Sequence, residues 1–123
     1  GHPSNREGLD VKKTVLYRQG KQQLDQRQYS ESYKTLGQLV RLQPDYQDSP
    51  RLLQQARTRA VERHYNEGLR LYREEKLPEA IREWRLVLEV DPQHANAQRN
   101  IEQAEDGHLI LNHAICTAIK AIQ

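Results

Sequence analysis

The sequence predicts an all-α protein made of two antiparallel helix-turn-helix repeats. This fold class follows from an internal repeat and from the helical spacing of apolar residues. When the 123-residue sequence is aligned with itself, identical residues recur 48 positions apart, including Tyr17 and Tyr65, Gly20 and Gly68, Pro44 and Pro92, and Arg51 and Arg99. Within each copy, apolar or small residues recur three or four positions apart, which places them on one face of an α-helix. Such a repeat indicates stacked units that bury their apolar faces against one another.

The composition agrees with amphipathic helices. Hydrophobic residues make up 36% of the chain and charged residues 29%, which suits helices with one buried face. The single cysteine, Cys116, excludes an intrachain disulfide and leaves the compartment open. No run approaches the ~18 consecutive apolar residues of a membrane span, so no membrane insertion is expected. Methionine is absent and the chain begins Gly-His-Pro-Ser, so we expect a fragment of a longer protein behind a vector-derived start.

The charges are unevenly distributed along the chain. Residues 1–60 contain 11 Lys+Arg and 6 Asp+Glu, whereas residues 61–123 contain 8 and 11. Two explanations remain open: solvated helix faces that differ by chance, and a charge-graded binding surface. Nucleic-acid binding is not expected, because the arginines of residues 51–63 alternate around a helix rather than line one face.

The second copy shows how each repeat is built. Its first helix carries Tyr65 and Gly68, and Pro78 then begins a second helix, where a first-turn residue needs no amide hydrogen. This second helix ends before Pro92, because proline disfavours helical geometry in the residue that precedes it. Gly68 and Ala80 are small where the two helices cross, and Trp84 fills the space between them.

These residues resemble the tetratricopeptide repeat. The matching residues of the second copy are Tyr65, Asn66, Gly68, Ala80, Trp84, Asp91 and Pro92. The resemblance covers residues 61–94 and, more weakly, residues 13–46, where Ser32 replaces the usual alanine and Gln23 stands where an apolar or aromatic residue is expected. It implies an α-α superhelix of helical hairpins with a C-terminal capping helix. The dense Gln and Arg usage and the segments 79–84 and 88–92 resemble those of bacterial repeat proteins.

The repeat period departs from the family. The usual period is ~34 residues, so residues 47–60 are an extension between the copies. Ser49 before Pro50 is a helix-start signal, and the apolar spacing continues into the second copy without Gly or Pro until Gly68. We therefore expect one long helix over about 50–75, whose protruding half is a natural site for oligomer contacts.

The C-terminal segment differs in composition from the rest. Residues 109–122 contain a single charged residue, Lys120, and still show helical spacing, with Leu111, Ile115, Ala118 and Ile122 on one face. Two origins remain open for residues 107–123: a capping or dimerisation helix over 108–123, or vector-encoded or out-of-frame sequence. The expected helices of the whole chain lie near 11–26, 30–42, 50–75, 78–90, 95–105 and 109–122.

No catalytic residue, metal site or cofactor is expected, and the chain is predicted not to be an enzyme. The sequence contains no glycine-rich phosphate loop, CxxC pair, HExxH or glycine-flanked serine. His64 replaces an aromatic residue at a repeat interface. His108 and His113 are five residues apart, which is the wrong phase for sharing a metal on one helix face.

The resemblance also implies where a partner binds. In this family the first helix of each repeat lines a concave groove, and the inward residues by spacing are Thr14, Tyr17, Arg18, Lys21 and Leu24 in the first copy and Glu62, Tyr65, Asn66, Leu69, Tyr72 and Arg73 in the second. Tyrosine offers contact area at small entropic cost, and arginine forks to carboxylates. Packing between helices is the alternative role for Tyr17 and Tyr65. Some members of the family bind a terminal carboxylate with a set of Lys, Arg and Asn residues. Such binding is not expected here, because only Asn66 falls on a matching position.

The predicted function is a protein-protein interaction scaffold that binds a peptide or protein partner in this groove. The alternative is a self-assembly module of a larger bacterial multidomain protein, which would form a homo-oligomer through the long helix and the apolar C-terminal helix. The bacterial cytoplasm and the periplasmic side of the cell envelope both remain open as its location.

Overall fold

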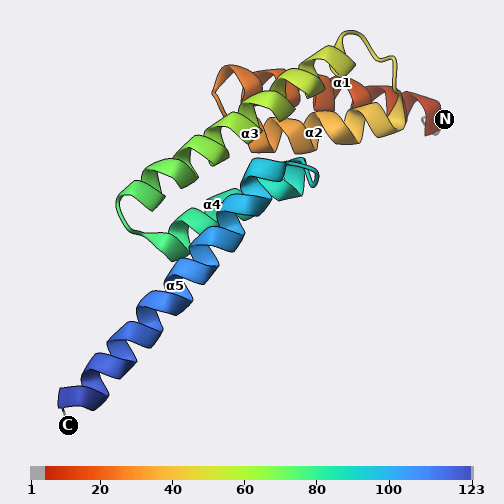
Figure 1. Cartoon of the computed structure of the whole chain (residues 1–123). Helices are drawn as coiled ribbons and strands as arrows, with labels where there is room; N and C mark the ends of the chain where they lie inside the picture. The colour runs from red at the N-terminus through yellow and green to blue at the C-terminus, as the bar shows by residue number, and fades with distance from the viewer. Residues whose placement is uncertain (1–4, 123) are drawn as a thin grey trace. The chain divides into compact units, whose positions relative to one another are not determined.

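The protein is all-α over the residues that the structure describes. A computed structural model describes the backbone of residues 5–122 and the side chains of residues 6–107 and 117–122. Its helices are α1 (Asn5–Asp25), α2 (Tyr29–Leu42), α3 (Ser49–Arg73), α4 (Leu77–Val90) and α5 (Ala95–Ile122) (Figure 1). Residues 5–122 contain no β-strand, so the all-α part of the predicted fold class is confirmed.

The chain divides into two compact units at residue 60, within α3. The first unit, residues 1–60, contains α1, α2 and the first half of α3. The second unit, residues 61–123, contains the rest of α3 together with α4 and α5. The 48-residue repeat places a helical hairpin in each unit, α1 with α2 and the second half of α3 with α4.

In the first unit, α1 and α2 cross at Gly20. A Cβ atom at Gly20 would lie 2.5 Å from Leu36 Cδ2, so a larger residue there would force the Leu36 side chain to move. The hydroxyl of Ser32 donates a hydrogen bond of 2.8 Å to the carbonyl oxygen of Gly20, which satisfies a polar group in a fully buried position. The surrounding core consists of Leu16, Leu24, Leu36, Leu39, Leu52 and Ala56.

The second unit repeats this crossing with larger side chains. A Cβ atom at Gly68 would lie 2.6 Å from Trp84 Cδ1, and the equivalent of Ser32 is the buried Ala80. The indole Nε1 of Trp84 donates to the carbonyl oxygen of Tyr65 at 3.2 Å. The core here consists of Leu71, Ala80, Ile81, Trp84, Val87, Ala97, Ile101 and Ala104. Trp84 is 1% exposed, which confirms its predicted burial.

Both hairpin turns end the first helix in the same way. Arg27 and Glu75 adopt φ values of 62° and 64°, a left-handed conformation that glycine usually occupies after a helix. The amide of the next residue, Lys76 in the second turn, donates to the carbonyl of Leu71 at 2.9 Å. This bond closes a Schellman motif around a residue that is not glycine.

Replacing Glu75 with glycine is therefore expected to stabilise the protein by about 0.5–1 kcal/mol, because a side chain in the left-handed region costs about that much or more. Urea denaturation followed by circular dichroism measures the change. Glu75→Ala retains the unfavourable φ and should bring no such gain. Equal gains from both variants would show that loss of the carboxylate, rather than of the strain, is responsible.

The predicted long helix is confirmed, whereas the predicted break at Gly107 is wrong. The helix expected over 50–75 is the uninterrupted α3. The separate helices expected over 95–105 and 109–122 are one helix, α5, which continues through Gly107. A single glycine costs a helix only about 1 kcal/mol, and no proline follows it to stop the backbone ladder. The first helix also begins earlier than predicted, at Asn5 rather than near residue 11.

Candidate functional site

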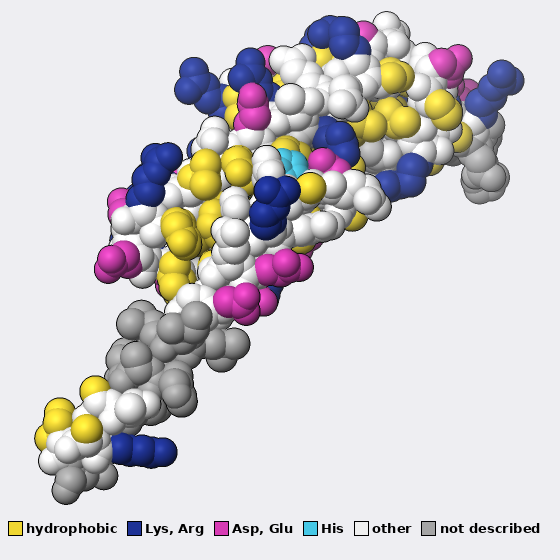
Figure 2. All heavy atoms as spheres, viewed as in Figure 1, with side chains coloured by type: hydrophobic (Ala, Val, Ile, Leu, Met, Phe, Trp, Pro, Cys, Tyr) yellow, Lys and Arg dark blue, Asp and Glu magenta, His cyan; other side chains and the backbone are white. Residues whose placement is uncertain are grey.

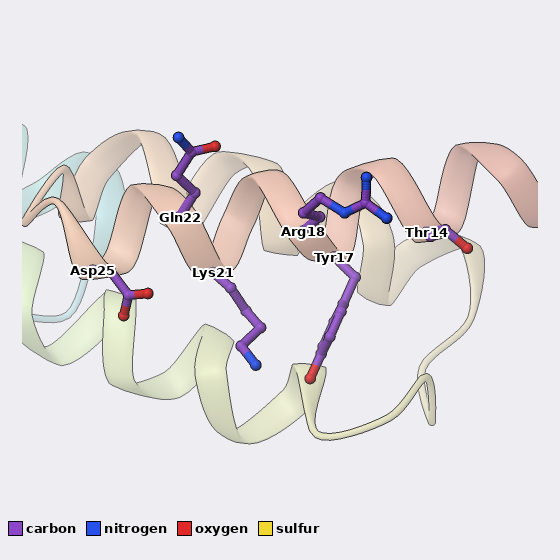
Figure 3. Close-up of a pocket in the computed structure, with 6 residues that line it drawn as sticks. All are labelled: Thr14, Tyr17, Arg18, Lys21, Gln22 and Asp25. Carbon is purple, nitrogen blue, oxygen red and sulfur yellow. The ribbon is translucent and has the colours of Figure 1, made fainter.

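A hollow of about 480 Å³ lies along α1 in the first unit. Its lining consists of Thr14, Tyr17, Arg18, Lys21, Gln22 and Asp25, all from this helix (Figure 3). Residues three or four positions apart are neighbours on a helix surface, which explains why these side chains share one face. The volume lies within the usual range for ligand pockets, about 300–1,000 Å³.

The hollow brings together four of the five groove residues that the sequence predicted in the first copy, Thr14, Tyr17, Arg18 and Lys21. Tyr17 is half-buried, whereas Arg18 and Lys21 are exposed. Leu24, which the groove pattern also included, lies instead in the core. The apolar side chain turns inward because its position faces α2 and the start of α3. Gln22 and Asp25 were not predicted, although each lies four residues beyond a predicted residue and spacing could have found them.

Tyr17 is held by the segment between α2 and α3. Its hydroxyl donates to the carboxylate of Asp48, and its ring meets the ring of Tyr46 edge-on, with centroids 5.6 Å apart. Asp48 also accepts a hydrogen bond of 2.7 Å from Arg51 Nη2. The hydroxyl of Tyr17 therefore has its hydrogen-bond partner within the protein. Its ring is held in place and remains available for contact with a binding partner.

The same contacts shift two pKa values in opposite directions. The hydrogen bond to Asp48, with burial, raises the pKa of Tyr17 above its ordinary value. The hydrogen bonds from Tyr17 and then Arg51 lower the pKa of Asp48. A lowered carboxyl pKa means that this contact stabilises the fold above the ordinary pKa and is lost as pH falls through the lowered one.

Tyr17→Phe should move the pKa of Asp48 back toward 3.8, its ordinary value, because the largest cause of the shift is gone. NMR titration of the carboxyl carbons measures this pKa, and urea melts below pH 5 should show a smaller loss of stability with acid than in the parent protein. Tyr33→Phe, which changes a half-buried tyrosine of α2, serves as the control. An unchanged Asp48 pKa in Tyr17→Phe would contradict the hydrogen bond.

The basic side chains of the hollow have no acidic partner among the described residues. Lys21 Nζ lies 5.3 Å from the centroid of the Tyr17 ring, a cation-π distance. No described carboxylate forms an ion pair with Arg18 or Lys21. Lys21 therefore lies over the aromatic face, and Arg18 adds a second exposed positive charge to the lining of the hollow.

The corresponding tyrosine of the second copy is also engaged within its unit. The Tyr65 ring lies 5.2 Å from the His94 ring, and its hydroxyl accepts a hydrogen bond from Asn100 Nδ2 at 3.3 Å. Tyr46 and His94 are themselves 48 residues apart, so each repeat tyrosine packs against an aromatic ring two residues after a proline. This contact between the turn and the first helix was not predicted, although the equivalent positions of Tyr46 and His94 in the 48-residue repeat could have indicated it.

The remaining predicted residues of the second copy vary in exposure. Asn66 and Arg73 are exposed, Leu69 is half-buried against the core, and Tyr72 is 46% exposed with its ring 5.9 Å from that of Trp84. Arg73 lies in the last turn of α3, where a cation is favoured by the helix dipole. The described hollow does not include this copy.

No metal-binding group is found among the described side chains. Groups of three or more His, Cys, Asp or Glu suited to a metal do not occur there. His64 Nδ1 lies 2.7 Å from Glu83 Oε2, a contact that joins α3 to α4 and supports its structural role. His108, His113 and Cys116 lie outside the described side chains. Over the described part of the chain, no helix is both long and apolar enough to cross a bilayer.

Comparison with known proteins adds no relative. No model of a protein family matches the chain, and no curated protein sequence matches it.

Proposed function

We propose that this chain is a helical-repeat module of the tetratricopeptide type that binds a peptide segment of a partner protein, without catalytic activity. The observation that carries the proposal is the hollow on α1, where Lys21 lies over the fixed ring of Tyr17 and neither Arg18 nor Lys21 pairs with a carboxylate of the described side chains. Tyrosine and arginine are among the side chains that most often dominate binding energy at protein interfaces.

The repeat type is supported by equivalent packing in the two units. Gly20 meets Leu36 as Gly68 meets Trp84, and the two pairs are 48 residues apart. The left-handed residues Arg27 and Glu75 obey the same spacing. Two hairpins built by one set of rules are what a repeat protein requires.

Binding is expected to depend on the basic pair. Peptides selected from a random displayed library against the full chain should lose at least about tenfold in affinity for Arg18→Ala/Lys21→Ala, which corresponds to about 1.4 kcal/mol. Lys12→Ala/Lys34→Ala removes the same charge at exposed positions outside the hollow and should bind normally. If both double variants lose affinity equally, net charge rather than the hollow governs binding.

Self-assembly is the second candidate function. At the end of α5, Ile119 is 51% and Ile122 is 85% exposed, and Figure 2 shows hydrophobic side chains gathered near the C-terminal end of this helix. Exposed aliphatic side chains that lie together favour association. Mass measured at micromolar concentration, with and without residues 108–123, tests this candidate: a monomer in both cases would exclude it.

A further inference from the structure

The two ends of the hollow differ in charge. Lys21 lies over the Tyr17 ring, and Arg18, one turn toward the N-terminus of α1, adds a second positive charge to the lining. Asp25 supplies a carboxylate at the opposite end. Figure 3 shows Asp25 at one end of the row and Thr14 at the other, with Lys21 and then Tyr17 and Arg18 between them. Tyr17 and Lys21 point to the same side of α1, and Arg18 does not point with them. The hollow is therefore an electric dipole along the helix.

The spacing of Arg18 and Asp25 along α1 follows from helix geometry. Arg18 and Asp25 are seven residues apart, which is about 10 Å along the axis at 1.5 Å per residue. A peptide in the polyproline II conformation has three residues per turn and rises about 3.1 Å per residue. Its residues i and i+3 therefore face the same side and lie about 9 Å apart. This distance matches the axial spacing of Arg18 and Asp25.

Asp25 is poorly explained by the stability of α1. It is the last residue of the helix, and no basic residue occupies the last turn. The carbonyl end of a helix carries partial negative charge, so a carboxylate there is unfavourable. Asp25 forms no ion pair with a described residue, whereas its counterpart in the second copy is Arg73, the favoured sign. A residue that opposes local stability while lining a hollow indicates a binding role.

We propose, on the basis of the proposed function, that the hollow binds an extended peptide segment carrying one acidic and one basic side chain three residues apart. The acidic side chain pairs with Arg18 and Lys21, and the basic one pairs with Asp25. The Tyr17 ring, fixed by Asp48 and Tyr46, packs against the backbone between them. Recognition thus depends on a pair of opposite charges at a fixed spacing rather than on net charge.

The test uses four short probe peptides, containing Glu-Pro-Pro-Lys, Glu-Pro-Pro-Glu, Lys-Pro-Pro-Lys or Ala-Pro-Pro-Ala. Each is titrated into the full chain while the amide signals of α1 are followed by NMR. The Glu-Pro-Pro-Lys peptide is expected to bind about three- to tenfold tighter than any other, as the exchange of one attractive contact for a repulsive one implies. High salt should remove the difference.

Charge-reversal variants should redirect this preference. Asp25→Lys makes the hollow wholly positive and should favour the Glu-Pro-Pro-Glu peptide, whereas Arg18→Glu/Lys21→Glu should favour Lys-Pro-Pro-Lys. Glu31→Lys, at an exposed site on α2, makes the same change in net charge as Asp25→Lys. It should leave the parent protein's order of peptide affinities unchanged. Asp25→Lys should also melt no lower than the parent, so altered binding cannot be attributed to unfolding.

The outcomes separate the two proposals. Equal shifts of the α1 amides with all four peptides would overturn the charge-pair rule and leave peptide binding at the hollow intact. No shifts with any peptide up to millimolar concentration would overturn both. Redirected preferences in the control Glu31→Lys would also count against the rule, because they would show that net charge alone selects the peptide.

Discussion

Trp84→Ala is expected to lower the free energy of unfolding by about 3–5 kcal/mol, the range for loss of a large buried aromatic side chain. Trp84 is the largest fully buried side chain of the protein. Its ring covers Gly68, and its Nε1 donates to the carbonyl of Tyr65 at 3.2 Å. Removal leaves a cavity in the core of the second unit and one backbone carbonyl without its extra donor. Urea denaturation followed by circular dichroism measures the loss.

Two further variants define what Trp84 contributes. Trp84→Phe keeps much of the apolar volume but loses the indole donor, so its cost should be well below that of alanine. Leu36→Ala makes the equivalent cavity in the first unit, at a fully buried position, and should cost about 2–5 kcal/mol. A loss below about 1 kcal/mol in Trp84→Ala would mean that the tryptophan does not hold α3 against α4.

Gly68→Ala is expected to cost about 1–3 kcal/mol even though alanine is the better helix former. The added methyl group would overlap the indole ring of Trp84, with 2.6 Å to Cδ1, and a fully buried ring has no space into which to move. Overpacking of a close helix crossing costs about this amount, which exceeds the gain of up to about 1 kcal/mol from helix propensity. Thermal and urea melts test the sign of the change.

The other glycines provide a graded comparison. At Gly20 the overlap is with the side chain of Leu36, which is more flexible than an indole, so Gly20→Ala should cost less than Gly68→Ala. At Gly107 nothing lies within 4 Å, and Gly107→Ala should stabilise α5 by up to about 1 kcal/mol. An order other than Gly68, Gly20, Gly107 in decreasing cost would contradict these helix crossings.

Much of the fold could be predicted from the sequence because it depends on local chemistry and on the repeat. Helix positions followed from apolar spacing, Pro78 and Pro92, and the continuity of α3 followed from the absence of Gly and Pro before Gly68. The change in composition after residue 107 wrongly suggested two helices where α5 is one. The conformational cost of one glycine is small beside the continuous hydrogen-bond ladder of α5.

The candidate site could be predicted only in part. Helical spacing was sufficient to group Tyr17, Arg18 and Lys21, since residues on one helix face stay together in any fold. It could not show that Leu24 turns into the core, because spacing alone does not fix where the buried face ends. It also could not show that Asp25 forms no ion pair with the side chains that the structure describes, since that depends on residues distant in the sequence.

The helices, the two hairpins and the close crossings at Gly20 and Gly68 could be inferred from the chain alone, because periodicity and side-chain volume act locally and repeat every 48 residues. The role of Tyr17 depends on the three-dimensional fold. Its hydroxyl is satisfied by Asp48, 31 residues away, and its ring by Tyr46, contacts that depend on the path of the turn between α2 and α3. Hydrogen bonds across such distances depend on how the chain returns on itself, which no local pattern specifies.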